Sequence, residues 1–588
     1  MHNSTLSADE LRRRIDCALG RTPCDLVLRN ACVFNVFTKS FTEHADIAID
    51  SGVIVDVGTN SAAKGCKEVD LNNAPLVPGF IDAHVHIESS MLRPREFARL
   101  ILSKGTTAIV ADPHEIANVC GLEGIRFMIE DARDAAVDIR FMLPSCVPAT
   151  PFETSGATLT ADELQILINE PAVLGLAEVM NVPAVLAGED DMLAKILLAA
   201  RAGKAVDGHA PMLSGAALSA YAAAGVSSDH ECSTATEALD RISRGMTVFM
   251  REGSAGQNVK ALAPVVTHEN CSMFCLCTDD ASPDDVICKG HINNVLRRAV
   301  ECGVGLEDAL CMATINPARH FGLAGKGAVA PGYEADLVVL ENLRTFDVKA
   351  VYRAGLCSQE IESKPAEPLP ASVTGRVRIK PLADDAFAIS CPEGQARVIG
   401  LRPGDLITES LVLPVVIDND GFVDVAACPD LVKVAVVERH HATGNVGLAL
   451  VKGLTAAGRK LNGAIATTIS HDSHNIIVAG DNDADMLAAV GTIEAVGGGI
   501  VLVRAGRVVQ SLKLEIAGLM TAADWQSTAQ RKIELVETAH RDFGVAADVH
   551  PIMAVSLLAL AVIPALRVTD KGLFDAVAFK HVPIGTED

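Results

Sequence analysis

The chain has 588 residues, of which 49% are hydrophobic and 21% are charged. This composition is typical of a globular protein and excludes a disordered chain. A single hydrophobic core rarely grows beyond roughly 250–300 residues, so two or three domains are expected. The formal net charge of −24 disfavours binding to nucleic acid or to an anionic membrane surface, because both carry negative charge themselves.

The segment from Met1 to Arg14 is polar and has no apolar stretch of the kind found in secretory signals. The sixteen cysteines are scattered and include no pair with zinc-ribbon spacing. We therefore expect reduced, mostly buried thiols and a cytoplasmic protein. The longest apolar run, Ile552 to Leu566, contains Pro564 and is too short to span a bilayer. It predicts a buried helix and no association with a membrane.

Strand-like segments lie on both sides of the middle of the chain. The first group lies between residues 24 and 58, where Ile47 to Gly58 is typical of a hairpin around Ser51-Gly52. The second group lies between residues 328 and 356. We expect the two flanks, residues 1–77 and 326–375, to join into one small β-rich domain.

Between the flanks, short apolar strands alternate with helical stretches such as Ala161–Glu170 and Asp190–Ala202. Eight such units within about 240 residues predict an α/β fold, a closed parallel (β/α)8 barrel of the TIM type over residues 78–325. The predicted strands are Gly79–His86, Thr107–Asp112, Ile139–Pro144, Leu174–Met180, Ala205–His209, Val226–His230, Thr247–Arg251 and Ser272–Asp279. Residues 357–380 are rich in Pro, Ser and Lys and indicate a linker, and the alternation after it predicts a C-terminal α/β domain over residues 376–588.

Histidine and carboxylate side chains end several of the predicted strands. Positions i and i+2 of an extended segment face the same side, as His84 and His86 do at the end of the first strand. In a barrel of this kind the chemistry gathers at the C-terminal ends of the strands, and these ligand types suit Zn, Fe or Mn. One or two such ions lower the pKa of bound water to about 7 and so supply hydroxide at neutral pH. The candidate metal ligands are His84, His86, Glu178, His209, His230 and Asp279.

The segments around these residues resemble a known family. Pro78-Gly-Phe-Ile-Asp-Ala-His-Val-His86, with the later histidines and Asp279, is similar to the amidohydrolase superfamily over about residues 24–356. Within it, the chain looks like the bacterial adenine deaminases over nearly its whole length. This narrower resemblance includes the segments Ile87-Glu-Ser-Ser-Met-Leu92, Asp112-Pro-His-Glu-Ile-Ala-Asn118, Gly175-Leu-Ala-Glu-Val-Met-Asn181, Ser470-His-Asp-Ser-His-Asn475 and Ile563-Pro-Ala-Leu-Arg-Val-Thr-Asp-Lys-Gly-Leu573.

The resemblance implies that a metal-activated hydroxide attacks C6 of adenine, giving hypoxanthine and ammonia. It also implies two divalent ions per chain, with Mn or Fe favoured and Zn as an alternative. Many superfamily members bridge two ions with a carboxylated lysine on strand 4, whereas this chain has Glu178 there, as the adenine deaminases do. Glu178 is expected to bridge the ions or to protonate the ring nitrogen N1. Glu231 is the alternative proton donor, and Asp279 or Asp280 is expected to carry a proton to the departing amine.

The same resemblance implies a small purine substrate and, because family members commonly self-associate, a homo-oligomer such as a dimer. An amidohydrolase that acts on another aminopurine or on a cyclic amide is the alternative function. A substrate panel separates these functions, because opening a cyclic amide releases no ammonia.

Several weaker features have two interpretations each. Asp112, His114 and Glu115 follow the second predicted strand and are candidates to contact the base or orient a ligand, or they form only a polar turn. Arg251 at the end of strand 7 is a candidate to recognise ring nitrogens, or a structural ion pair. The polar cluster Ser470–Asn475 either closes over the barrel mouth, holds another ion or is an ordinary interface loop, and Glu438-Arg-His-His441 has the same alternatives.

Overall fold

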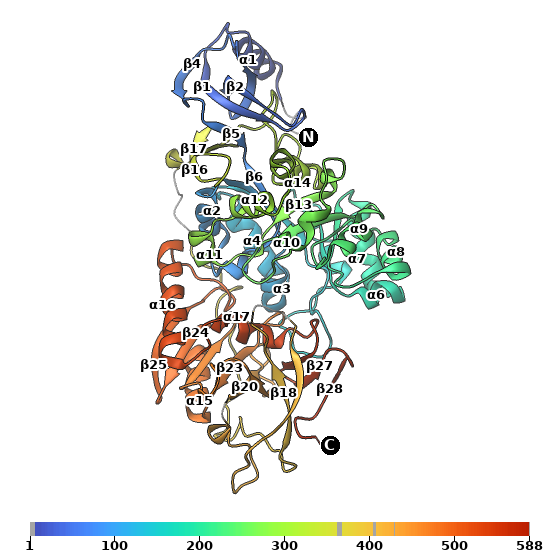
Figure 1. Ribbon diagram of the computed structural model, residues 1–588, viewed down its shortest axis with the longest axis vertical. Coiled ribbons are helices and arrows are strands. Elements are labelled where there is room, and N and C mark those ends of the chain that lie inside the picture. The colour runs from blue at the N-terminus through green and yellow to red at the C-terminus, as the bar shows by residue number, and fades with distance from the viewer. Residues whose placement is uncertain (1–5, 362–366, 404–406, 429, 587–588) are drawn as a thin grey trace.

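A computed structural model describes residues 6–361, 367–403, 407–428 and 430–586 of the chain. Figure 1 shows three units stacked along the long axis: a β-rich unit at the top, an α/β barrel in the middle and a second α/β unit at the bottom. The first strands of the chain lie in the upper unit and the last strands in the lower one. The barrel therefore has a different neighbour at each end.

The middle unit is built on parallel strands. One sheet has the strand order β10-β9-β8-β7-β6-β14 and a second has the order β11-β12-β13. Strand β13 also contacts β6, and β10 contacts β11, so the two sheets form a TIM-like barrel. The strands are β6 (Phe80–His86), β7 (Thr106–Ala111), β8 (Asp138–Leu143), β9 (Val173–Val179), β10 (Ala205–Gly208), β11 (Ser228–Asp229), β12 (Thr247–Arg251), β13 (Phe274–Cys277) and β14 (Asp279–Asp280).

Each predicted barrel strand overlaps a strand of the structure. The last one, Ser272–Asp279, is interrupted. Its start belongs to a 3-10 helix, Cys271–Met273, and its end forms the separate strand β14. The break falls at Thr278, whose N–H donates to the side chain of Asp82 on β6 and not to a backbone carbonyl. Asp279 and Asp280, which follow the break, pair with Val85 and His86 of the same strand.

Helices surround the barrel strands. In α12 (Ile292–Glu301) the buried residues Ile292, Val295, Leu296 and Ala299 follow the i, i+3, i+4, i+7 spacing of an amphipathic helix. The other barrel helices are α2 (Pro94–Leu102), α3 (His114–Cys120), α4 (Leu122–Ala132), α5 (Ala161–Leu164), α6 (Val182–Ala187), α7 (Asp190–Arg201), α8 (Gly215–Ala223), α9 (Ala235–Ile242), α10 (Val259–Leu262), α11 (Pro283–Cys288), α13 (Leu306–Met312) and α14 (Ile315–His320).

One of the two helices predicted from sequence is shorter than expected. The helix predicted at Asp190–Ala202 is confirmed as α7, whereas the segment Ala161–Glu170 contains only the short helix α5. Beyond α5 the N–H groups of Ile166 and Glu170 bond to the third residue back, which gives tight turns in place of an α-helix.

The upper unit is a sheet with the order β17-β16-β15-β5-β1-β2-β3, with β4 paired to β1. Antiparallel pairing of Val338 in β15 with Val77 in β5 joins the two flanks of the barrel in one sheet. The predicted hairpin is present, and both turn residues, Ser51 and Gly52, have positive φ, as a tight two-residue hairpin requires. The strands are β1 (Cys24–Asn35), β2 (Ser40–Asp50), β3 (Val53–Gly58), β4 (Gly65–Asp70), β5 (Pro75–Pro78), β15 (Leu337–Leu340), β16 (Val348–Arg353) and β17 (Leu356–Cys357), and α1 (Ala8–Ala18) precedes them.

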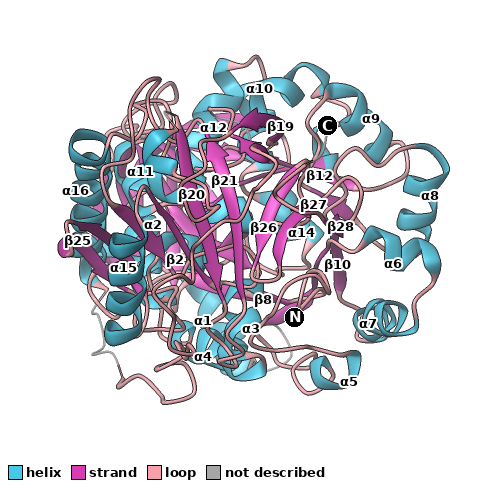
Figure 2. Cartoon of the chain, turned by 90° about the horizontal axis from the view of Figure 1, so that it is seen from below, coloured by secondary structure: helices cyan, strands magenta, loops and turns pink. Residues whose placement is uncertain are grey.

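The lower unit contains a mostly antiparallel sheet, β19-β18-β21-β20-β23-β22-β24-β25, and a small sheet, β26-β27-β28. Figure 2 shows α15 and α16 along one edge of this unit, with α16 beside α2 and α11 of the barrel, which it contacts. The strands are β18 (Gln395–Gly400), β19 (Glu409–Pro414), β20 (Leu431–Val437), β21 (Val446–Lys452), β22 (Ala464–Thr467), β23 (Ile476–Gly480), β24 (Gly499–Arg504), β25 (Arg507–Lys513), β26 (Leu566–Thr569), β27 (Gly572–Asp575) and β28 (Lys580–His581). The helices are α15 (Asp483–Val496), α16 (Trp525–Phe543) and α17 (Pro551–Ser556).

The long helix predicted at Ile552–Leu566 is wrong in its second half. Helix α17 ends at Ser556, a 3-10 turn follows to Ala559, and Leu566 already belongs to β26. Pro564 has no N–H to continue a helix, and the residues before it turn toward the barrel mouth, where Ile563 lines a cavity. Within the described residues, no helix is both long and apolar enough to cross a membrane.

Candidate metal centre

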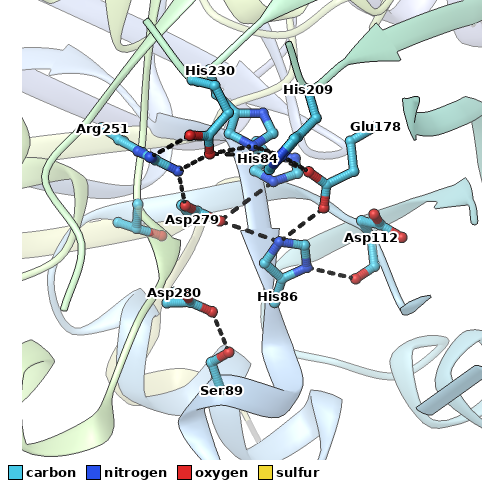
Figure 3. Close-up of polar contacts among 12 residues, drawn as sticks. His84, His86, Ser89, Asp112, Glu178, His209, His230, Arg251, Asp279 and Asp280 are labelled. Carbon is cyan, nitrogen blue, oxygen red and sulfur yellow. Dashed lines mark hydrogen bonds and ion pairs between the residues drawn. The ribbon is translucent and has the colours of Figure 1, made fainter. Parts of the chain in front are cut away.

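The six candidate ligands converge at the C-terminal ends of the barrel strands (Figure 3). His84 and His86 end β6, Glu178 lies on β9, His209 and His230 follow β10 and β11, and Asp279 begins β14. Their side chains are buried apart from His209, which is partly exposed. The strand ends that the sequence places far apart therefore meet at one point.

Glu178 lies between two groups of histidines. Its Oε2 is 2.7 Å from Nδ1 of His209 and 3.2 Å from Nε2 of His230. Its Oε1 is 3.4 Å from Nε2 of His86. The two oxygens of this one carboxylate therefore face different histidine groups.

Asp279 faces the first pair of histidines. Its Oδ1 lies 3.2 Å from Nε2 of His86 and 3.6 Å from Nε2 of His84. The backbone of Asp279 has φ of +63°, a left-handed conformation that residues other than glycine rarely adopt. This conformation is what turns the carboxylate toward the histidines.

The ring nitrogens and carboxylates at this point offer the donor atoms that a divalent metal ion requires. Nδ1 of His86 lies 3.1 Å from the carbonyl oxygen of Asp112, so Nδ1 carries the proton and donates, and Nε2 keeps a free lone pair. Nε2 of His84 is buried and has no hydrogen-bond partner among the described residues. Donor atoms of His84, His86 and Asp279, and separately of His84, Glu178 and His230, lie within 4.8 Å of one another. Imidazole nitrogens with carboxylate oxygens are the donor set that Zn, Fe and Mn accept.

Arg251 pairs with two carboxylates beside this centre. Its Nη1 lies 2.6 Å from Oε1 of Glu231 and 2.5 Å from Oδ2 of Asp279, and its Nη2 lies 3.0 Å from Oε2 of Glu231. Burial alone raises the pKa of Glu231, but the Arg251 guanidinium and nearby histidines outweigh burial and lower it. The structure therefore places Arg251 in an ion pair, the second of its two interpretations, although it also lines the cavity.

Asp280 is held differently from Asp279. The hydroxyl of Ser89 donates to its Oδ1 at 2.5 Å, and the carboxyl lines the cavity. Burial and the neighbouring Asp279 raise the pKa of Asp280. Ser89 belongs to the segment whose resemblance narrowed the family, but no sequence pattern links it to Asp280, which lies 191 residues further along the chain.

Asp112 and His114 extend the cluster on the side of β7. Nδ1 of His114 lies 2.9 Å from Oδ2 of Asp112 and 3.3 Å from Oε1 of Glu178. Ligand atoms of His86, Asp112, His114 and Glu178 form another group within 4.8 Å. Asp112 thus contacts two histidines, through its carbonyl to His86 and through its carboxylate to His114.

Glu115 lies between His114 and the lower unit, with its Oε1 3.6 Å from Nε2 of His114. Its Oε1 lies 2.7 Å from Nδ1 of His471, and its Oε2 contacts Nε2 of His474. The polar cluster at 470–475 therefore reaches the barrel mouth. Glu438 belongs to the other cluster that had several interpretations, residues 438–441. Its carboxylate accepts hydrogen bonds from the N–H groups of His441 and Thr443, which lie in the same loop.

A cavity beside the six ligands lies between the barrel and the lower unit. Barrel residues on its wall include Met180, Arg251 and Asp280. The lower unit contributes His471, Asp472 and the apolar side chains Leu557, Leu560, Val562 and Ile563. Asp472 belongs to the polar cluster 470–475, for which closure over the barrel mouth was one of the interpretations. The four apolar residues carried no sequence signal for a site, because their pattern is that of a buried helix.

Comparisons with known proteins agree with this geometry. The model of the amidohydrolase family matches residues 76–357, and the model of the adenine deaminase C-terminal domain matches residues 405–580. An adenine deaminase of Nitratidesulfovibrio vulgaris is 48% identical over 575 residues, which are 97% of this chain and 98% of that relative. An adenine deaminase of Clostridium acetobutylicum is 43% identical over 576 residues, which are 97% of this chain and 100% of that relative. The similarity thus extends through both the barrel and the lower unit.

Proposed function

Because the chain belongs to the adenine deaminase family, we infer that it is a hydrolase that converts adenine and water to hypoxanthine and ammonia. The observation that supports this most directly is the position of Glu178 between His86 on one side and His209 and His230 on the other. This arrangement lies at the wall of a cavity, where a small base has access to it.

We propose that two divalent ions are held at this place, Mn or Fe in preference to Zn. The proposed ligands of one ion are His84, His86 and Asp279. The proposed ligands of the other ion are His209 and His230, and Glu178 is a proposed ligand of both. A bound divalent ion lowers the pKa of a coordinated water to about 7 and polarises the reacting group. The unpartnered Nε2 of His84 supports this assignment, because a buried polar atom without a partner is costly unless a ligand satisfies it.

We propose that the carboxyl groups of the chain move the protons of the reaction. Glu178 or Glu231 donates a proton to N1 of the purine, so that negative charge does not build up on the ring. Asp280 or Asp279 takes a proton from the attacking water and gives it to the departing amine. Asp280 is the better carrier, because Asp279 has one oxygen near two histidines and the other on Arg251.

Four further residues are proposed to bind or orient the substrate. His114, Glu115 and Arg251 line the cavity. Asp112 does not, and it acts through His114, whose ring it orients by a hydrogen bond. Its carbonyl oxygen orients His86 in the same way.

The wider organisation is also a proposal. We propose a small β domain formed by residues 1–77 and 326–375, a catalytic barrel over residues 78–325 and a C-terminal domain over residues 376–588. Pairing of β5 with β15 supports the first of these. We further propose that the enzyme acts in the cytoplasm as a homodimer.

The function is tested by loading metal-free protein in turn with Mn, Fe and Zn and incubating it with adenine. We expect hypoxanthine and ammonia in equal amounts. A cyclic amide and other aminopurines serve as comparison substrates. Protein with two ions per chain that leaves adenine unchanged, or that opens the cyclic amide faster than it deaminates adenine, contradicts the proposal.

A further inference from the structure

A loop of the C-terminal domain reaches into the barrel mouth. The 470–475 loop, Ser470 to Asn475, connects β22 and β23. Two of its histidines, His471 and His474, bind the two oxygens of Glu115 on α3. All three side chains are largely buried, with Glu115 and His474 almost without exposure. The loop is therefore fixed to the barrel at the edge of the proposed active site.

The tautomer of His474 identifies this contact as a hydrogen-bonded clasp. The N–H of Ser470 donates to Nδ1 of His474 at 3.2 Å, so Nδ1 carries the lone pair. In a neutral imidazole the proton then resides on Nε2, which faces Glu115. A metal ion at this point needs a lone pair on Nε2 instead. We therefore treat His471, His474 and Glu115 as a clasp between domains and not as an additional ion site.

The clasp positions Asp472, the residue between its two histidines. Asp472 is 5% exposed and lines the cavity together with Glu178 and Asp280. Its Oδ2 has no hydrogen-bond partner among the described residues. Burial, together with the neighbouring carboxylates of Glu115 and Glu178, raises the pKa of Asp472 to about 6. A buried, unsatisfied acceptor on a residue that lines a cavity is suited to a donor on a ligand.

We propose that Asp472 accepts a hydrogen bond from the imidazole N–H of a free purine base, so that the C-terminal domain supplies part of the substrate site. The inference rests on the proposed function. Adenine has two kinds of N–H donor, the amine at the reacting carbon and the N–H of its five-membered ring. The amine has to lie beside the six candidate ligands, because it leaves from the reacting carbon. The N–H of the five-membered ring is then left to face the wall that the C-terminal domain contributes.

The surroundings of Asp472 fit this role. Leu557, Leu560, Val562 and Ile563 line the same cavity and offer an apolar surface to the faces of a flat base. These side chains carry no hydrogen-bonding group, and His471 on the same wall is paired with Glu115, so the carboxylate of Asp472 is the group that we expect to select for a ring N–H. A purine whose ring nitrogen carries a substituent has no such hydrogen and leaves the carboxylate unsatisfied.

The test compares adenine with 9-methyladenine, which has no ring N–H, in the wild type, Asp472→Ala and Asp472→Asn. For Asp472→Ala we expect kcat/KM for adenine to fall by about 10- to 100-fold, mainly through KM, because one buried hydrogen bond is lost. The preference for adenine over 9-methyladenine is expected to shrink by a similar factor. Asp472→Asn keeps a carbonyl acceptor and the same volume, so we expect an intermediate preference.

Asp548→Asn, an exposed change in the same domain, is the matched control and should leave the preference unchanged. Metal content and the thermal midpoint are measured for every variant, so that misfolding is recognised. If Asp472 is only structural, both substrates lose activity equally and the preference stays constant, which overturns the inference while leaving the proposed function intact. A wild type that does not deaminate adenine at all overturns both.

Discussion

The carboxylate of Glu178 and the imidazole of His209 lie 2.7 Å apart, Oε2 to Nδ1, although they come from the ends of two different barrel strands. The other oxygen of Glu178 faces His86 at 3.4 Å. One side chain therefore connects the histidines of β6 with those that follow β10 and β11.

Replacing Glu178 with Gln should disrupt the pair of ions. Gln has no charge, and its amide nitrogen offers a donor where a ligand oxygen is needed. We expect at least one ion fewer per chain and kcat lower by about 100-fold or more. Elemental analysis and adenine turnover measure these effects. Glu494→Gln, an exposed change on α15, is the control, and a Glu178→Gln protein with two ions and normal kcat contradicts the bridging role.

Replacing Arg251 with Met should destabilise the protein as well as slow it. The change leaves Glu231 and Asp279 buried without their cation. Removing one partner of a buried pair typically costs about 3 kcal/mol or more, and urea unfolding of the metal-free protein measures this. Arg251→Lys keeps the charge but loses the forked geometry, so its stability should lie between the two. Equal stability of Arg251→Met and the wild type would show that the ion pair contributes nothing.

Replacing Ser89 with Ala should move the pH profile of kcat. The hydroxyl of Ser89 stabilises the ionised form of Asp280, so its removal raises the pKa of that carboxyl further. If ionised Asp280 accepts the proton, the acidic limb of the profile moves to higher pH, and kcat near neutrality falls by about tenfold. If the acidic limb does not move, Asp280 is not the proton carrier and the role falls to Asp279.

Replacing Glu153 with Gln should change how stability depends on pH. Burial and Asp472 raise the pKa of Glu153 to about 8, and its Oε2 has no partner among the described residues. The folded state therefore favours the protonated form of Glu153. The contribution of this preference to the free energy of unfolding is full below pH about 4.5 and is lost as pH rises through 8. The wild type should lose stability relative to Glu153→Gln between pH 5 and pH 9, by on the order of a few kcal/mol. Urea unfolding curves at each pH give the difference, and a constant difference contradicts the raised pKa.

The positions of the barrel strands were predictable because their signal is local. An apolar run followed by His84 and His86 indicates both a buried strand and its functional end, since alternation puts the two rings on one face. Glu178 and Asp279 could be added because parallel strands of a barrel end at the same rim. The left-handed backbone at Asp279, which aims its carboxylate, has no such signal.

Local patterns also misled at specific places. The run beginning at Ile552 has the composition of a buried helix, and it is buried, yet the chain turns after Ala559 so that Leu560 to Ile563 cover the cavity. Arg251 had two interpretations from the sequence, and the structure pairs its guanidinium with the carboxylates of Glu231 and Asp279 at the cavity wall. In both cases contacts with distant segments decided the outcome.

The sequence by itself determined the family chemistry of this protein: the ligand types, their placement at strand ends and the parallel barrel that gathers them. Only the tertiary structure decided which side chains of the lower unit line the cavity beside these ligands. Glu115 meets His471 and His474 across 356 and 359 residues of chain. Periodicity and motif spacing describe neighbours within one strand, helix or turn, whereas this contact depends on how two separately folded surfaces pack. The clasp and Asp472 beside it could therefore be found only in three dimensions.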